Sequence, residues 1–177
     1  MFWSNSLYIK KVLYDIFYEK VVKWCFTIIE RVSGMKKEDI EKILQSCSEV
    51  EKENKEYAIP TKEEWMNLEK QVQYVFPDEF KAFIDLMSVY LFPGDIFNAT
   101  EHNNNGNDTI LYVYQYESRY QEWDSHMIPF MGIGNGDYFC ISKLDSKIYY
   151  FYCDKLMFEV YSQSMSDWIK ELPDFLE

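Results

Sequence analysis

The spacing of the apolar residues changes near the middle of this chain, and this change limits the folds that the chain can adopt. In the N-terminal half, apolar side chains recur every three or four residues, which is typical of helices with one buried face. Thr61 and Glu64 have the spacing of a capping box, which favours a helix start at that point. Four helices are predicted in this half, over residues 5–32, 36–55, about 62–74 and a segment whose first turn holds Pro77.

The C-terminal half instead contains short runs rich in aromatic and β-branched residues, which favour strands. A closing helix is predicted over about 164–172. Because helices and strands occupy separate halves, we expect an α+β fold in which an antiparallel sheet packs with flanking helices, rather than alternating βαβ units. The predicted strands cover residues 109–116, 127–133, 137–142 and 147–153.

A chain of 177 residues holds two domains at most. Pro60 separates the second predicted helix from the third. We therefore divide the chain into an N-terminal extension of two helices, residues 1–56, and an α+β domain, residues 57–177. The helix over 5–32 has a broad apolar face, which we expect to pack on the rest of the protein. The alternatives are a membrane surface or a partner chain, including a second copy that dimerises through the extension.

The charge of the chain is distributed unevenly. Lys and Arg number 18 against 30 Asp and Glu, for a net charge of −12. Residues 1–56 hold ten of each sign, so the whole imbalance, eight basic against twenty acidic side chains, lies in residues 57–177. Such a field repels nucleic-acid phosphates and anionic lipid headgroups and attracts basic surfaces. We therefore expect no direct nucleic-acid binding and a basic protein partner.

Neither export nor a membrane span is predicted. Charged residues interrupt each apolar stretch before it reaches the roughly 20 residues needed to cross a bilayer. The four cysteines, Cys25, Cys47, Cys140 and Cys153, include no CxxC pair, which argues against a zinc site. A hairpin over residues 137–153 would place the last two on opposite faces, which argues against a disulfide between them. We expect reduced thiols and a cytoplasmic protein.

The side chains that could carry chemistry form no catalytic pattern. The glycine-rich stretch 132–136 lacks the spacing of a dinucleotide-binding loop, and a turn is the simpler interpretation. His102 and His126 are the only histidines, and neither belongs to a cluster that completes an acid–base or metal site. The aromatic run 149–152 could stack nucleobases, but its acidic surroundings favour a half-buried sheet with tyrosines exposed for protein contacts. We expect no enzyme, no cofactor and no metal.

Five segments carry a family resemblance: Trp65 to Leu68, residues 76–83 (FPDEFKAF), residues 128–130 (IPF) leading to 136–141 (GDYFCI), residues 149–154 and residues 164–172. In this order they resemble the SUKH superfamily, which includes fungal cell-wall-assembly regulators and many bacterial toxin-immunity proteins. The chain departs from the family pattern at two places. Residues 88–94 (SVYLFPG) stand where an Asn-Gly often follows the second helix, and residues 1–56 have no counterpart in the minimal domain.

The resemblance implies a non-catalytic α+β domain that acts by binding. Its bacterial members imply an immunity protein that neutralises a cognate toxin, often a nuclease. A general scaffold or regulatory module like the fungal members is the runner-up, and an enzyme of another type is the third alternative.

The candidate interface residues are chosen on physical grounds rather than from the family. They are acidic side chains at predicted loops or strand ends, with aromatic side chains nearby as anchors. For each acidic residue, simple solubilisation of the surface is the alternative. The candidates are Glu101, Asp108, Tyr114, Tyr116, Glu117, Tyr120, Glu122, Trp123, Asp124 and Asp137.

Overall fold

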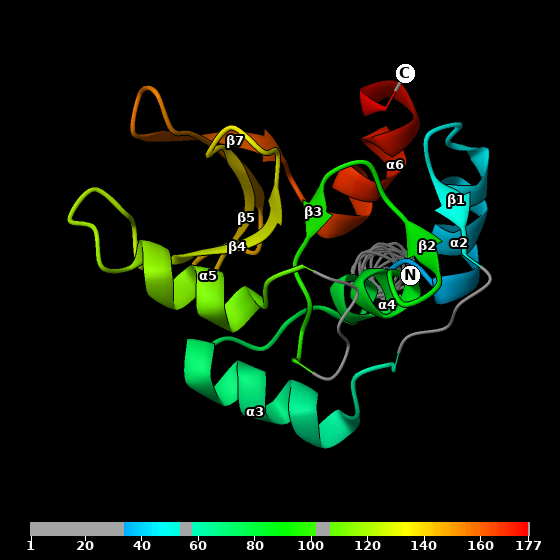
Figure 1. Ribbon diagram of the computed structural model, residues 1–177, viewed down its shortest axis with the longest axis horizontal. Coiled ribbons are helices and arrows are strands. Elements are labelled where there is room, and N and C mark those ends of the chain that lie inside the picture. Colours follow the sequence, from blue (N-terminus) through cyan, green and yellow to red (C-terminus); the bar gives the residue numbers. More distant parts are fainter. Residues whose placement is uncertain (1–33, 54–57, 102–106, 177) are drawn as a thin grey trace, which may run out of the picture. The chain divides into compact units, whose positions relative to one another are not determined.

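The computed structural model divides the chain into two compact units, Met1–Gly34 and Met35–Glu177. The described residues of the second unit are drawn in colour in Figure 1. The predicted helix over 5–32 lies outside the described residues, and so do its alternatives as a membrane-binding, partner-binding or dimerising element. The structure describes residues 34–53, 58–101 and 107–176.

The second unit has an α+β fold, as predicted. Strands β3 to β7 form one antiparallel sheet in the order β3-β4-β5-β6-β7, and β1 pairs with β2 in a separate antiparallel ladder. The helices of the described residues are α2 (Lys37–Ser46), α3 (Lys62–Val72), α4 (Asp78–Leu86), α5 (Ile110–Glu117) and α6 (Met165–Phe175). The strands are β1 (Glu51–Lys52), β2 (Tyr90–Leu91), β3 (Asp95–Ile96), β4 (Met127–Gly132), β5 (Tyr138–Ser142), β6 (Ile148–Tyr152) and β7 (Met157–Ser162).

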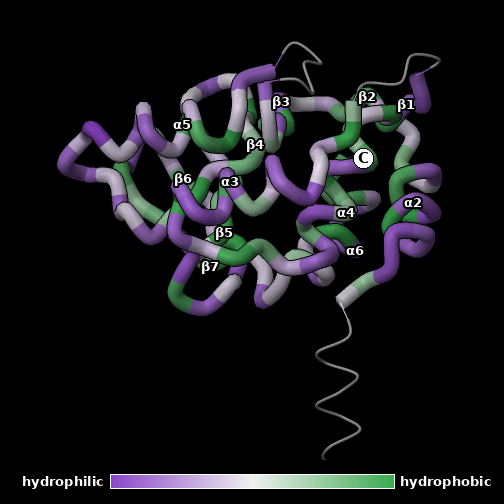
Figure 2. Tube along the Cα trace, turned by 90° about the horizontal axis from the view of Figure 1, so that it is seen from below, coloured by the Kyte–Doolittle hydropathy of each residue, from purple (hydrophilic) through white to green (hydrophobic). Residues whose placement is uncertain are grey.

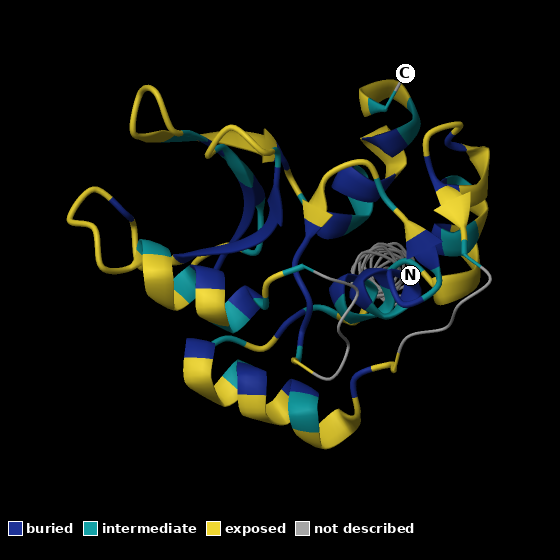
Figure 3. Ribbon diagram, viewed as in Figure 1, coloured by how far each residue is buried: buried dark blue, intermediate teal, exposed yellow. Residues whose placement is uncertain are grey.

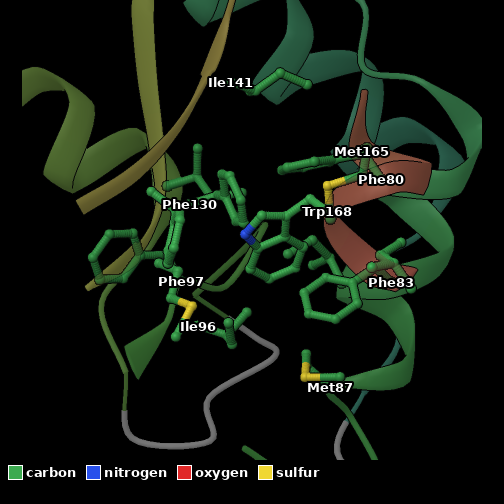
Figure 4. Close-up of a cluster of buried hydrophobic side chains, with 14 of the residues drawn as sticks. Phe80, Phe83, Met87, Ile96, Phe97, Phe130, Ile141, Met165 and Trp168 are labelled. Carbon is green, nitrogen blue, oxygen red and sulfur yellow. The ribbon is translucent and has the colours of Figure 1, made fainter. Parts of the chain in front are cut away.

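Aromatic rings from α4, α6 and the sheet form the main core. Trp168 of α6 lies edge-on to Phe83 of α4 at 5.3 Å and to Phe130 of β4 at 5.1 Å between ring centroids (Figure 4). Phe80 meets Phe130 in the same geometry at 5.5 Å. Edge-to-face contacts of this kind are preferred because the positive ring edge faces the negative ring face. Helices α4 and α6 thus pack against the sheet through this aromatic cluster.

Helix α2 belongs to this core. Ile40 and Leu44 are completely buried, and α2 packs against both α4 and α6. The alternation of hydrophobic and hydrophilic colour along α2 in Figure 2 is typical of a helix with one buried face. The structural boundary thus falls between Gly34 and Met35, whereas the sequence-based division placed it after residue 56. The predicted helix over 36–55 also ends earlier, at Ser46.

One predicted strand, residues 109–116, is wrong, because this segment forms helix α5. Its β-branched and aromatic composition favours a strand, but the burial has a helical spacing. Ile110 and Val113 are both buried, and residues three apart would point to opposite faces of a strand. The Thr109 hydroxyl caps the helix by accepting a hydrogen bond from the backbone N–H of Tyr112 at 3.1 Å. Tertiary burial and the cap outweigh local strand propensity here.

The other predicted strands are confirmed as β4, β5 and β6, and the predicted helices over 62–74, after Pro77 and over 164–172 as α3, α4 and α6. The capping box of Thr61 and Glu64 is present at α3. Strand β7 was not predicted; it lies at the edge of the sheet, and most of its side chains are exposed. The stretch 132–136 begins with the last residue of β4 and continues into the β4–β5 turn, with positive φ angles of 90° at Gly134 and 92° at Gly136.

Candidate functional site

Three exposed tyrosines line up along α5 and the turn that follows it. Tyr112, Tyr116 and Tyr120 are spaced by four residues, with exposed fractions of 53%, 40% and 51%. The ring centroids are 6.3 Å apart for the first pair and 5.7 Å for the second, and the Tyr120 hydroxyl donates to that of Tyr116 at 3.1 Å. We call these three residues the tyrosine stripe. Exposed tyrosines offer a large apolar ring with a polar tip, a combination common at protein interfaces.

Tyr112 was not among the sequence-based candidates, which included Tyr114 and Tyr116 from the same segment. In a strand, Tyr112, Tyr114 and Tyr116 would share one face, while a helical spacing of four joins Tyr112 to Tyr116 and Tyr120. The helical period alone would therefore have identified the stripe.

Tyr114 has a different position and is half-buried. Its hydroxyl donates to the carbonyl oxygen of Ser125 at 3.0 Å and accepts from the Lys143 ammonium at 2.6 Å. The same ammonium lies 4.4 Å from the centre of the Tyr114 ring. Tyr114 thus ties α5 to the loop over residues 118–126 and to the end of β5, rather than projecting as an anchor.

Trp123 lies in the loop over residues 118–126 but is buried, with an exposed fraction of 7%. Its ring packs against Phe151 at 5.0 Å and Phe158 at 5.1 Å, and its indole N–H donates to the carbonyl of Met127 at 3.2 Å. These contacts form a second, smaller core on the sheet, which consists of Trp123, Met127, Cys140 and Phe151. The indole therefore fixes the loop against the strands.

Four of the candidate carboxylates flank the tyrosine stripe. Glu101 and Asp108 are exposed near Tyr112, where all three line a hollow at the N-terminal end of α5. Glu117 and Glu122 line a different pocket near the C-terminal end, together with Tyr120. Acidic groups thus stand at both ends of the stripe.

Asp124 and Asp137 form hydrogen bonds with other residues of this chain. Asp124 accepts from the backbone N–H of His126 at 2.8 Å and lies 2.9 Å from its ring nitrogen Nδ1. Partial burial alone would raise the pKa of Asp124, but these two contacts outweigh it and lower the pKa. His126 therefore stabilises this turn through its two contacts with Asp124.

Asp137 joins the β4–β5 turn to the end of β6. It accepts from the backbone N–H of Cys153 at 2.8 Å, from the Tyr150 hydroxyl at 2.9 Å and from the Asn135 amide at 3.0 Å. Partial burial would raise the pKa of Asp137, but the three hydrogen bonds outweigh it and the pKa is lowered. This carboxylate holds two turns together.

The pocket beside Tyr120 has a volume of about 240 Å³. It lies between the loop over residues 118–126 and the β6–β7 turn, two exposed segments that project at the same end of the sheet in Figures 1 and 3. We call it the aromatic pocket; it is lined by Glu117, Tyr120, Glu122, Trp123, Gly136, Tyr138, Phe151, Cys153 and Leu156. The sequence-based candidates included four of these residues. The others come from strands and turns that only the tertiary fold brings near α5.

The described residues contain no group of three or more His, Cys, Asp or Glu side chains placed to hold a metal ion. His102 lies outside them. Cys47 and Cys140 are buried free thiols, and Cys153 is an exposed one. In the part of the chain that the structure describes, no helix combines the length and apolar character that a bilayer span requires.

The domain has a five-stranded antiparallel sheet packed with helices, and α5 presents an acidic and aromatic surface. This α+β architecture differs from the alternating βαβ units of nucleotide-binding folds. The family model named SUKH_5 and described as "SMI1-KNR4 cell-wall" matches residues 38–174. The chain therefore belongs to this SUKH family. The match begins within α2 and ends within α6, so α2 lies inside the family domain. A search of curated proteins returned no match.

Proposed function

We propose that this chain is a non-catalytic, cytoplasmic immunity protein that neutralises a cognate bacterial toxin by binding it directly. The observation that carries this proposal is the tyrosine stripe, whose three rings remain exposed on α5 and the turn that follows it. Interfaces draw most of their binding energy from a few aromatic and arginine anchors, so such a stripe is suited to protein contact.

Electrostatics indicates the chemistry of the partner. Carboxylates stand at both ends of the stripe, and residues 57–177 carry twenty acidic against eight basic side chains. A surface of this kind attracts a basic protein and raises the rate of encounter at low salt. A nuclease is the toxin class that fits best, because its substrate-binding surface must attract phosphates. An acidic protein that covers this surface would exclude the nucleic acid.

The test is co-expression with a candidate toxin, the C-terminal domain of the protein encoded directly upstream of this chain. Cells induced for the toxin should survive only when this chain is present, and the two proteins should co-purify as a one-to-one complex. The association rate of that complex should fall as salt is raised from low concentration to 1 M, because screening removes the long-range attraction. Unchanged killing in the presence of the folded chain would contradict the proposal.

A scaffold or regulatory role of the cell-wall-assembly type is the second candidate, and the description of the matching family favours it. A scaffold would bind several partners weakly, whereas an immunity protein binds one partner tightly. Affinity purification of the chain from its own cells, followed by a count of partners and their dissociation rates, separates the two roles.

A further inference from the structure

The lining of the aromatic pocket includes the rings of Tyr120, Trp123, Tyr138 and Phe151. The Trp123 ring lies 5.8 Å from Tyr138 and 5.0 Å from Phe151, while Tyr138 and Phe151 stack at 6.3 Å with an interplanar angle of 21°. Tyr120, about half exposed, and Leu156 stand at the rim. Closely set aromatic rings present negative π-faces, which attract cations.

Two acidic side chains, Glu117 and Glu122, also line this pocket. Glu117 accepts a hydrogen bond from the Tyr138 hydroxyl at 2.8 Å, which fixes its Oε1 at the pocket wall. Burial, and then the neighbouring Glu117 carboxylate, raise the pKa of Tyr138, so this hydroxyl stays a neutral donor. Glu122 is exposed at the same pocket.

No basic side chain of the described residues lines the pocket. Its nine lining residues include no Lys or Arg, and neither carboxylate forms an ion pair with a described cation. The nearest basic side chains in sequence lie over other rings: Arg119 is 5.7 Å from the centre of Tyr116, and Lys155 is 4.4 Å from that of Tyr152. An aromatic and anionic pocket without an internal cation is complementary to a cation from outside.

We propose that the aromatic pocket binds the guanidinium group of an arginine side chain presented by the protein partner. This inference rests on the proposed function, since it names the chemistry of that partner at one end of the tyrosine stripe. Arginine fits better than lysine because its planar, weakly hydrated cation stacks on aromatic rings and also pairs with carboxylates through a fork of N–H donors.

The test uses the full chain labelled with 5-fluorotryptophan and observed by fluorine NMR. The Trp123 signal, assigned with a Trp123→Phe variant, reports directly on the pocket wall. The probes are N-acetyl-arginine methylamide, the matching lysine compound and the citrulline compound, a neutral isostere of arginine. We expect the arginine probe to shift the Trp123 signal in a saturable way, with at least about threefold weaker binding of lysine and no saturable shift with citrulline.

Two variants and a control test the role of charge. Glu117→Gln retains an acceptor for the Tyr138 hydroxyl, and Glu122→Gln changes an exposed group; each should weaken the arginine probe about fivefold. Glu63→Gln, in the first turn of α3, is the matched control and should leave binding unchanged. Equal binding of arginine and citrulline, equal binding of arginine and lysine, or no saturable Trp123 shift with arginine would each overturn the inference.

Cys153 supplies an independent measurement, because its exposed thiol lines the pocket while Cys47 and Cys140 are buried. Alkylation of Cys153, followed by mass spectrometry, should slow when the arginine probe or the bound toxin domain is present. If the chain rescues cells and binds the toxin while Cys153 stays fully reactive, the arginine inference fails and the proposed function stands. If the arginine probe binds but no toxin is neutralised, the proposed function fails and the pocket's chemistry stands.

Discussion

The main core and the region around α5 each contain a buried tryptophan, but the two tryptophans lie in different surroundings. Trp168 sits between α4, α6 and the sheet with 1% of its surface exposed, whereas Trp123 lies in a loop and belongs to a small cluster of four buried residues. Both residues are surrounded by aromatic rings. The first group of rings stabilises the main core, while the second fixes a loop beside the aromatic pocket. Similar aromatic composition thus stabilises the core at one site and, in our proposal, serves recognition at the other.

The largest expected effect is on the free energy of unfolding. Trp168→Ala should lower it by about 4–5 kcal/mol, because the surrounding rings cannot collapse into the space. Trp123→Ala should lower it by about 2–3 kcal/mol, because the exposed loop can relax. Urea unfolding measures both, and Trp168→Phe serves if the alanine variant does not fold. Equal costs at the two positions would contradict the distinction between the regions.

Helix caps give a smaller and closely matched comparison. The Thr109 hydroxyl caps α5 and the Ser164 hydroxyl caps α6, each accepting a backbone N–H three residues later at 3.1 Å. Replacing either by Ala should destabilise its helix by about 1 kcal/mol. We expect Thr109→Ala to speed hydrogen exchange mainly in α5, and Ser164→Ala to lower the stability of the whole unit, since α6 carries Trp168. Identical exchange patterns would show that α5 is not a separately responding region.

The smallest expected effect is a pH dependence at Asp137. Its pKa is lowered in the folded protein, so the stability it contributes is present above the unfolded value of about 3.9 and is lost as pH falls through the lowered folded value. Unfolding free energy measured from pH 5 downward should therefore fall less steeply in Asp137→Asn than in the unaltered chain. Asp154→Asn, on the adjacent turn, is the control and should keep the original slope.

Local signals predicted much of the fold. The capping box at Thr61 and the apolar spacing of α3, α4 and α6 depend on neighbours within one or two turns, which a sequence displays directly. Helix α5 was mispredicted because its composition favours a strand, and only its contact with the sheet reveals which residues are buried. The position of α2 within the core likewise depends on α4 and α6, which are distant in sequence.

The candidate site was less predictable than the fold. Sequence reasoning selected acidic and aromatic residues between Glu101 and Asp137, and the structure brings Glu117, Tyr120, Glu122 and Trp123 together at one pocket. Sequence reasoning could not distinguish the exposed Tyr116 from the hydrogen-bonded Tyr114. A strand places these two side chains on the same face, whereas a helix does not. Tyr138, Phe151 and Cys153 join the pocket through the pairing of β5 with β6, which no local pattern specifies.

The central claim is that the α5 surface, rather than another exposed apolar surface, binds the partner. The most direct test is to measure the affinity of variants of this chain for the co-expressed toxin domain. A variant combining Tyr112→Ala, Tyr116→Ala and Tyr120→Ala should keep its fold, since the rings are exposed, and should bind at least about a hundredfold more weakly. A control combining Val160→Ala and Tyr161→Ala, on the exposed edge strand β7, should change affinity by less than about threefold. Retained affinity in the first variant with loss in the second would contradict the account and place the interface on the sheet edge.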